Sequence, residues 1–135
     1  MDVETVVAEP LSPVSVRVSA RDLQVIQDKP NNHGGDNQGM MASELLLAGL
    51  VGCQHSTFVK VAAKRRLDAQ VVAVRGEMEF EDGDISALRI HFELVSTSPA
   101  EAIATAIRLT DKTCTISRVL KIAVQSDYTL VATPA

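Results

Sequence analysis

The chain has 135 residues and a net charge of −4, and 46% of its residues are hydrophobic although only 3% are aromatic. This length is typical of one compact domain, and the composition supports an aliphatic core. The acidic balance, without a basic stretch that interleaves with aromatic residues, argues against nucleic acid as a partner. We therefore expect a single domain over residues 1–135, with residues 1–12 flexible or loosely packed.

The chain also shows no sign of export or of a membrane span. Its acidic N-terminus lacks the basic region of a signal peptide. The longest apolar stretch, residues 45–53, is far shorter than the roughly 20 residues that a membrane helix needs. We expect a soluble cytoplasmic protein, in which a disulfide would be transient and catalytic rather than structural.

The first half of the chain predicts a hairpin followed by a long helix. Apolar residues alternate with polar ones over 14–20, and a return strand over 23–28 follows the turn Arg21-Asp22. Residues 29–38 are rich in Gly and Asn, which predicts a flexible loop. The helix that follows, from about Met41 to Arg66, is apolar nearly all round in its first half, which implies deep burial.

The second half predicts a hairpin, helices and a last strand. Alternating residues over 72–81 and 88–94 flank the turn Asp82-Gly83. The segment Ser98-Pro99-Ala100-Glu101 is a capping box that starts a helix, and a further helical turn holds Cys114. The pattern predicts an α+β fold with largely antiparallel sheets around a long buried central helix. Because such a helix needs cover on every side, the chain is expected to form a dimer.

The chain contains only two cysteines, Cys53 and Cys114, which lie 61 positions apart. They are either two inert core residues or a thiol pair that reacts. At about 100° per residue, Thr57 shares the helix face of Cys53, whereas His55 lies about 200° round and cannot reach that sulfur. Cys53 also lies mid-helix, away from the N-terminal amides that lower a thiol pKa. Any activation of Cys53 must therefore come from elsewhere in the fold.

Two separated segments resemble the OsmC/Ohr family of small thiol-dependent peroxidases. They are GGDNQGMMASELLLAGLVGC, residues 34–53, and KTCTISRVLK, residues 112–121. The resemblance covers roughly residues 14–131 and implies an intertwined α+β homodimer with two active sites at the subunit interface. It also implies that Cys53 attacks an organic hydroperoxide and becomes a sulfenic acid. Cys114 then closes a disulfide, which an external dithiol reduces without a metal or other cofactor.

The resemblance assigns an arginine to the site. Arg21, in the first turn, matches the arginine that would stabilise the thiolate and polarise the peroxide, and Arg17, within a strand, is the weaker candidate. In the organic-hydroperoxide branch, a glutamate ten positions before the reactive cysteine holds this arginine, but that position is Ser43 here. Either the adjacent Glu44 holds the arginine instead, from a frayed helix start, or the glutamate–arginine clamp is absent. The plain roles are an N-cap for Ser43 and a first-turn acid for Glu44.

Other candidate groups carry weaker signals. Met40 and Met41, at the helix mouth, could line an apolar substrate pocket. The three histidines have no metal-ligand spacing, and His91 is expected to be simply solvated. The competing functions are a non-peroxidatic dimer that binds a small ligand or senses redox state, and a purely structural dimerisation module whose cysteines lie too far apart to bridge.

Overall fold

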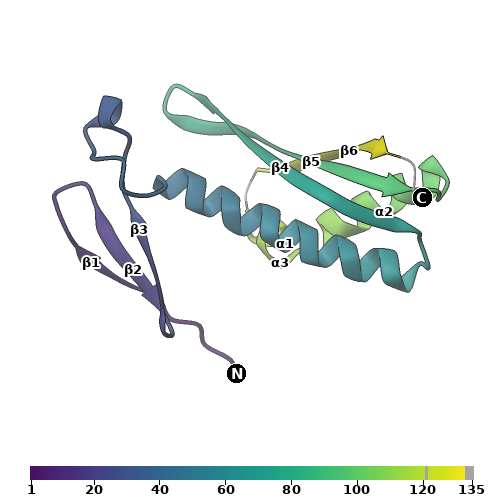
Figure 1. Cartoon of the computed structure of the whole chain (residues 1–135), viewed down its shortest axis with the longest axis horizontal. Helices are drawn as coiled ribbons and strands as arrows, with labels where there is room; N and C mark the ends of the chain where they lie inside the picture. The colour runs from purple at the N-terminus through teal and green to yellow at the C-terminus, as the bar shows by residue number, and fades with distance from the viewer. Residues whose placement is uncertain (121, 133–135) are drawn as a thin grey trace. The chain divides into compact units, whose positions relative to one another are not determined.

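The computed structural model describes residues 1–120 and 122–132, and its contacts divide the chain into two compact units, Met1–Leu46 and Leu47–Ala135 (Figure 1). The expected single domain over residues 1–135 stays a prediction. Lys121, the last residue of the second motif, lies outside the described residues.

The first unit contains a three-stranded antiparallel sheet in the order β1-β2-β3, formed by β1 (Val7–Pro10), β2 (Val16–Ala20) and β3 (Leu23–Gln27). The predicted hairpin is present, and Arg21 in its turn adopts a positive φ of 57°. Strand β1 was not predicted, because its four residues show no strand pattern in the sequence and form a strand by pairing with β2. Residues 1–10 are all exposed, and Val7–Pro10 are held in the sheet by pairing with β2, so the expectation of a loosely packed segment over residues 1–12 stays a prediction.

The loop after β3 is held by one buried carboxylate. Asp28 is 2% exposed, and its side chain accepts hydrogen bonds from the backbone N–H groups of Lys29 (2.7 Å), Asp36 (3.2 Å) and Gln38 (3.1 Å). The bond from Lys29, with those from Gln38 and Asp36, lowers the pKa of Asp28 against the effect of burial. The loop also contains the short 3₁₀ helix η1 (Asn31–His33). The predicted loop is therefore present, and the Asp28 carboxylate fixes part of its backbone.

The long helix α1 (Ala42–Lys64) matches the predicted range closely. At its start, the Met41 N–H donates to Glu44 Oε1 over 2.8 Å, which is half of a capping box. Ser43 is the second helical residue and not the N-cap. Within one chain α1 buries a single stripe rather than its whole circumference: Leu50, Gln54, Phe58 and Ala62. Deep burial all round was an overestimate, because one chain supplies one sheet and one short helical layer to cover it.

The second unit contains a sheet in the order β4-β5-β6, formed by β4 (Ala69–Glu81), β5 (Asp84–Ser96) and β6 (Val124–Ala132). The predicted turn joins β4 and β5, and Asp82 and Gly83 both have a positive φ, as a type I′ hairpin requires. Strand β6 pairs with β5 in parallel, which the expectation of largely antiparallel sheets did not anticipate. The reason is the helical crossover between these strands, which brings the chain back in the same direction.

A register shift in β4 changes which valines face the core. The shift lies between Val71 and Ala73, so Val71 packs against the core and Val72 is exposed. The alternation had assigned Val72 to the apolar face. A bulge of this kind depends on the partner strand, and a one-residue slip moves side chains to the other face.

The crossover consists of two helices, α2 (Ala100–Thr113) and α3 (Thr115–Val119). Ser98 does not cap α2 as predicted, because its hydroxyl accepts a hydrogen bond from the Asp68 N–H (2.9 Å) at the entrance to β4. α1 and α2 pack on the same side of the β4-β5-β6 sheet (Figure 1), where Phe58 and Phe92 stack with ring centroids 5.0 Å apart. This core is aliphatic around one aromatic pair and holds the elements that carry both cysteines.

By length and composition alone, α1 would pass as a membrane-spanning helix, contrary to the expectation from the apolar stretch within it. The core helix of a soluble protein meets the same criterion. In this fold, Leu50, Phe58 and Ala62 of α1 belong to the hydrophobic core. Its apolar character is therefore explained, at least on this stripe, by packing within the protein.

Candidate active site

The fold of the second unit brings the two cysteines into contact. The thiol of Cys114 donates a hydrogen bond to the sulfur of Cys53, and the two Sγ atoms lie 2.8 Å apart. Both cysteines are free, and the separation is longer than the roughly 2.05 Å of a disulfide bond. Cys53 is half-buried and Cys114 is fully buried. The pair can therefore close a disulfide with little movement of either helix.

Cys114 lies in a break between two helices and not inside one, which corrects the sequence-based expectation. Its backbone, with φ −58° and ψ 120°, separates α2 from α3. Its N–H donates to the carbonyl of Thr110 (2.8 Å), and its own carbonyl accepts from the Arg118 N–H (3.1 Å), so both helices are anchored to it. Thr113, Cys114 and Thr115 are all weak helix formers, which allows the break at this point.

The surroundings of Cys53 favour its thiolate. Burial raises the pKa of the Cys53 thiol. Four hydrogen bonds lower this pKa by more than burial raises it, so the net shift is downward. They come from the Cys114 thiol, the Ile116 N–H, the Thr57 hydroxyl and the Thr115 N–H. Thr57 lies one turn along α1, with its Oγ1 4.0 Å from the Cys53 sulfur. The two amides are the first of α3. Three of the four stabilising groups thus come from the segment around Cys114, as the sequence analysis expected, and the fourth, Thr57, comes from α1 itself.

Beside the thiols lies a buried polar network that the sequence analysis missed. Gln54 directly follows Cys53, and its amide nitrogen contacts Asp111 Oδ1 (2.8 Å) and Ser117 Oγ (2.7 Å). The Ser126 hydroxyl donates to the same Asp111 oxygen (2.7 Å). Burial raises the pKa of Asp111, although the bonds from Ser126 and Gln54 lower it. The available signal was a glutamine in the otherwise apolar buried stripe of α1.

A hollow of about 500 Å³ opens next to Cys53. Its walls combine threonine, lysine and small apolar side chains: Thr57, Lys60, Val61, Ala63, Lys64, Thr113 and Thr115. Two of these lining residues, Thr57 and Thr115, also hydrogen-bond the Cys53 sulfur, although Cys53 itself does not line the hollow. It is large enough for a small organic molecule, and the sequence analysis did not identify it.

The remaining candidates lie in the first unit. Arg21 is exposed in the β2–β3 turn, and Arg17 lies in β2, paired with Ile26. The Glu44 carboxylate accepts the bond from Met41 at the helix start. Met40 is exposed, whereas Met41 helps to line a hollow of about 280 Å³ with Val14, Gln27, Asp28, Lys29, Ala42 and Ser43. The roles of Arg21, Glu44, Met40 and Met41 at the thiol site stay predictions.

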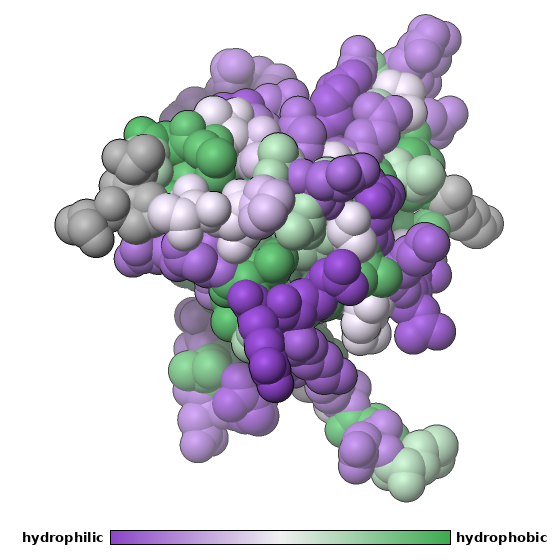
Figure 2. All heavy atoms as spheres, turned by 90° about the vertical axis from the view of Figure 1, so that its right-hand side faces the viewer, coloured by the Kyte–Doolittle hydropathy of each residue, from purple (hydrophilic) through white to green (hydrophobic). Residues whose placement is uncertain are grey.

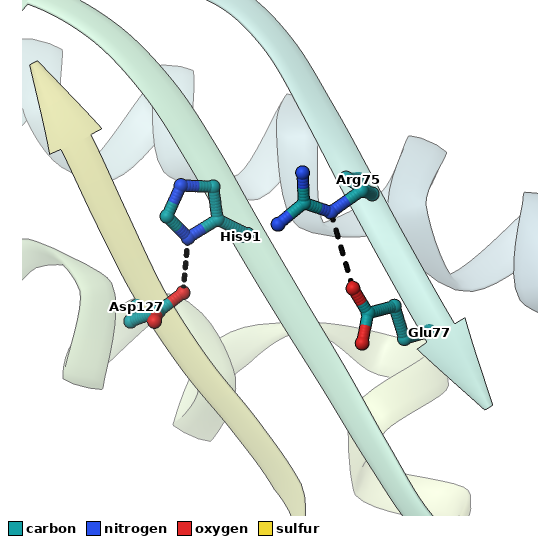
Figure 3. A network of polar contacts seen from close by, with 4 residues as sticks. All are labelled: Arg75, Glu77, His91 and Asp127. Atoms are coloured by element: carbon teal, nitrogen blue, oxygen red, sulfur yellow. Dashed lines mark hydrogen bonds and ion pairs between the residues drawn. The ribbon is translucent and has the colours of Figure 1, made fainter. Parts of the chain in front are cut away.

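A second polar cluster lies on the solvent-facing side of the β4-β5-β6 sheet (Figure 3). His91 Nδ1 lies 2.5 Å from Asp127 Oδ1, and Arg75 pairs with Glu77 at 3.2 Å. His91 is thus paired and not simply solvated. These four side chains form two ion pairs on the exposed face of the sheet, and no cysteine lies among them, so we do not take this cluster as the reactive site. Among the described residues, no group of three or more His, Cys, Asp and Glu side chains could hold a metal ion.

The hydrogen bonds at Cys53 generate a titration prediction. In the reduced protein, alkylation of Cys53 by iodoacetamide should follow a pH profile with its midpoint below about 8.5, the value of a free thiol. In Cys114→Ala the midpoint should move upward, because the largest pKa-lowering bond is lost. Site-specific mass spectrometry measures both profiles. A wild-type midpoint at or above that of a free thiol, or no shift in the variant, would contradict this description of the thiol.

Comparison with known proteins identifies the family. A family model described as OsmC-like protein matches residues 35–129. The chain is similar to the structure of an OsmC-like protein from Mycoplasma pneumoniae, with 18% identity, a TM-score of 0.77, and coverage of 97% of this chain and 99% of that one.

Structures of two organic hydroperoxide resistance proteins are also similar. The Legionella pneumophila protein has 15% identity and a TM-score of 0.70, and 98% of each chain is covered. Bacillus subtilis OhrB has 16% identity and a TM-score of 0.68, with 95% of this chain and 98% of that one covered. No curated protein matches the sequence. The structural likeness establishes the fold, and because the family model spans most of the sequence, the chain belongs to the OsmC-like protein family.

Proposed function

We propose that the protein is a thiol-dependent peroxidase that reduces organic hydroperoxides to alcohols. The observation that carries this proposal is the pair of sulfurs 2.8 Å apart, one of which has a pKa below the ordinary thiol value. A lowered pKa supplies the nucleophile, and a second thiol within reach supplies the means to resolve its oxidised form. Membership of a family that includes organic hydroperoxide resistance proteins supports the same chemistry.

In the first step, the Cys53 thiolate attacks the distal oxygen of the hydroperoxide. An S–O bond forms, the O–O bond breaks, and the leaving alkoxide takes a proton from solvent to become the alcohol. Sulfur is oxidised to a sulfenic acid while the peroxide is reduced. The amides of Thr115 and Ile116, with the Thr57 hydroxyl, favour the thiolate that starts this step.

In the second step, the Cys114 sulfur attacks the Cys53 sulfur. An S–S bond forms, the S–O bond breaks, and the hydroxide leaves as water with the proton of Cys114. An external dithiol then reduces the disulfide by exchange and restores both thiols. No metal or resident cofactor takes part in this proposed cycle.

The substrate is proposed to enter through the hollow that begins at Thr57 and Thr115. Arg21, with Glu44 as its partner, is proposed to polarise the peroxide, and Met40 and Met41 to contact its organic part. In the structure α1 starts regularly, and Glu44 accepts a hydrogen bond from the Met41 N–H. To hold Arg21, the Glu44 carboxylate would exchange or share this bond. The protein is proposed to act in the cytoplasm.

The active form is proposed to be an intertwined homodimer. The strands of the first unit leave Leu23, Val25 and Ile26 exposed, and α1 exposes Val59 at 48%. Figure 2 shows hydrophobic side chains at the surface among hydrophilic ones. A three-stranded sheet needs an apolar surface to pack on, and a second copy of this chain would cover these residues.

Neither competing function is favoured by the geometry. A structural module was expected to keep its cysteines out of reach, but here the sulfurs are in contact. A ligand-binding dimer needs no thiol with a lowered pKa and no second thiol beside it. Redox sensing would use the same two thiols but without rapid turnover, so kinetics separates it from the peroxidase.

The peroxidase proposal predicts dithiol-dependent consumption of cumene hydroperoxide by the wild type. Cys53→Ser removes the nucleophile and should lower the rate by at least about 10³-fold. His55→Ala, an exposed neighbour on the same helix, is the control and should keep the wild-type rate. Coupled assays with dihydrolipoamide or dithiothreitol measure these rates. A wild type that is no faster than Cys53→Ser would rule out the proposed activity.

The dimer proposal predicts a sedimenting mass of twice the 14.5 kDa of the chain. Val59→Asp should dissociate the dimer, because a charge would be buried in an apolar interface. Val59→Thr keeps the branched shape and should remain dimeric. Sedimentation velocity at micromolar concentration makes the measurement, and a wild-type monomer under these conditions would refute the proposed assembly.

A further inference from the structure

One side chain of α1 is tied to both helices that flank Cys114. Gln54 is the residue after Cys53, and it is fully buried. Its amide nitrogen contacts Asp111, three positions before Cys114, and Ser117, three positions after it. The two thiols are thus linked twice: by the contact between their sulfurs and by a hydrogen-bonded bridge between their neighbours.

We infer that Gln54 and Asp111 form a positioning clamp that holds Cys114 against Cys53 and sets the rate of the disulfide-forming step. The inference rests on the proposed peroxidase function and adds two positioning residues to it. Neither residue touches the reacting sulfur atoms in the described contacts. Both act through the placement of Cys114.

The α2–α3 break explains why Cys114 needs a clamp. Helix α3 has only five residues, and a helix this short is not stable by itself. Its orientation relative to α2 is therefore set by tertiary contacts. The bond from Gln54 to Ser117 holds α3, the bond to Asp111 holds the end of α2, and Cys114 lies at the joint. A fixed joint keeps the attacking sulfur near its target.

The energetics of Gln54 support a role in orientation. Its Oε1 is buried and has no hydrogen-bond partner among the described residues. A buried polar atom without a partner is costly, so packing alone does not explain an amide at this position of the core. What the amide contributes instead is directional: two bonds that fix one arrangement of α1, α2 and α3. Asp111 in turn is anchored to β6 by the bond from Ser126.

Resolution is the chemical step most sensitive to this arrangement. The Cys114 sulfur must approach the Cys53 sulfur from 2.8 Å to about 2.05 Å, opposite the departing hydroxide. The attack of the Cys53 thiolate on the peroxide does not involve Cys114 as a reactant, but the Cys114 thiol and the α3 amides lower the pKa of Cys53. At a pH where Cys53 is fully ionised in every variant, this second effect is removed. Loosening the joint should then slow the second step and leave the first nearly unchanged, because a misplacement of about 1 Å can cost about 10²-fold in rate.

The test separates the two steps in single turnover. Reduced protein is mixed with one equivalent of cumene hydroperoxide without a reductant, at a pH above the Cys53 titration midpoint of every variant, and quenched over time. Mass spectrometry then follows the dimedone adduct of the Cys53 sulfenic acid and the Cys53–Cys114 disulfide. The variants are Asp111→Ala and Ser117→Ala, which each remove one acceptor, and Asp111→Asn, which keeps an acceptor oxygen. Glu101→Ala replaces an exposed acid on the same helix and is the matched control.

In Asp111→Ala, disulfide formation should slow at least about 10-fold while oxidation of Cys53 stays within about threefold of wild type. Asp111→Asn should restore the rate of disulfide formation, and Ser117→Ala should show the same selective effect should Asp111→Ala not fold. Equal loss in both steps would indicate a merely structural role and overturn the inference. So would an unchanged rate of disulfide formation, or an Asp111→Asn variant as slow as Asp111→Ala.

A second measurement judges the clamp independently of peroxide chemistry. The equilibrium between the Cys53–Cys114 disulfide and glutathione reports how closely the two thiols are held. The equilibrium constant for forming the protein disulfide from the two thiols and oxidised glutathione should fall at least about 10-fold in Asp111→Ala. It should remain at the wild-type value in Glu101→Ala. If hydroperoxide fails to oxidise the wild type, the proposed function fails, and this equilibrium alone decides the inference: an unchanged constant overturns it.

Discussion

The contact between the sulfurs of Cys53 and Cys114 depends on a break in the helical crossover, and the rest of the site follows from that break. An uninterrupted helix would keep the amides of Thr115 and Ile116 in intrahelical bonds. Because the helix stops at Thr113 and restarts at Thr115, free N–H groups point at Cys53 while the Cys114 thiol lies over it. One backbone irregularity thus provides both the second thiol and the groups that favour the thiolate.

Burial acts on the site in two opposing ways. It raises the pKa of the Cys53 thiol, and it strengthens the hydrogen bonds that lower it, since water competes less for the same donors. The outcome depends on how many donors the fold can aim at one sulfur. The same logic applies to Asp111, where burial prevails over two donors and the pKa of the carboxyl is raised. Burial therefore decides the direction of the pKa shift at Asp111, and the hydrogen bonds decide it at Cys53.

The sequence predicted features that depend on local patterns. The helix range, the Asp82-Gly83 turn and the two cysteines with their family motifs were identified, because each is encoded within a few consecutive residues. The parallel pairing of β6, the bulge beside Val72 and the bond from the Asp68 N–H to Ser98 were missed, because each depends on a distant partner. The candidate site divides in the same way: Cys53, its proposed nucleophile, was chosen from a motif, but the α3 amides, Asp111 and the hollow beside Thr57 exist only in the folded chain.

The central claim is that Cys53 and Cys114 act as one redox pair towards a hydroperoxide. Its most direct test is the stoichiometry of oxidation: reduced protein is titrated with cumene hydroperoxide, and free thiols and cumyl alcohol are counted together. The account predicts that each hydroperoxide consumed removes two thiols, yields one alcohol and joins the Cys53 and Cys114 peptides by a disulfide. Alcohol production without thiol loss, or oxidation of Cys53 to a sulfinic acid while Cys114 stays free, would contradict it.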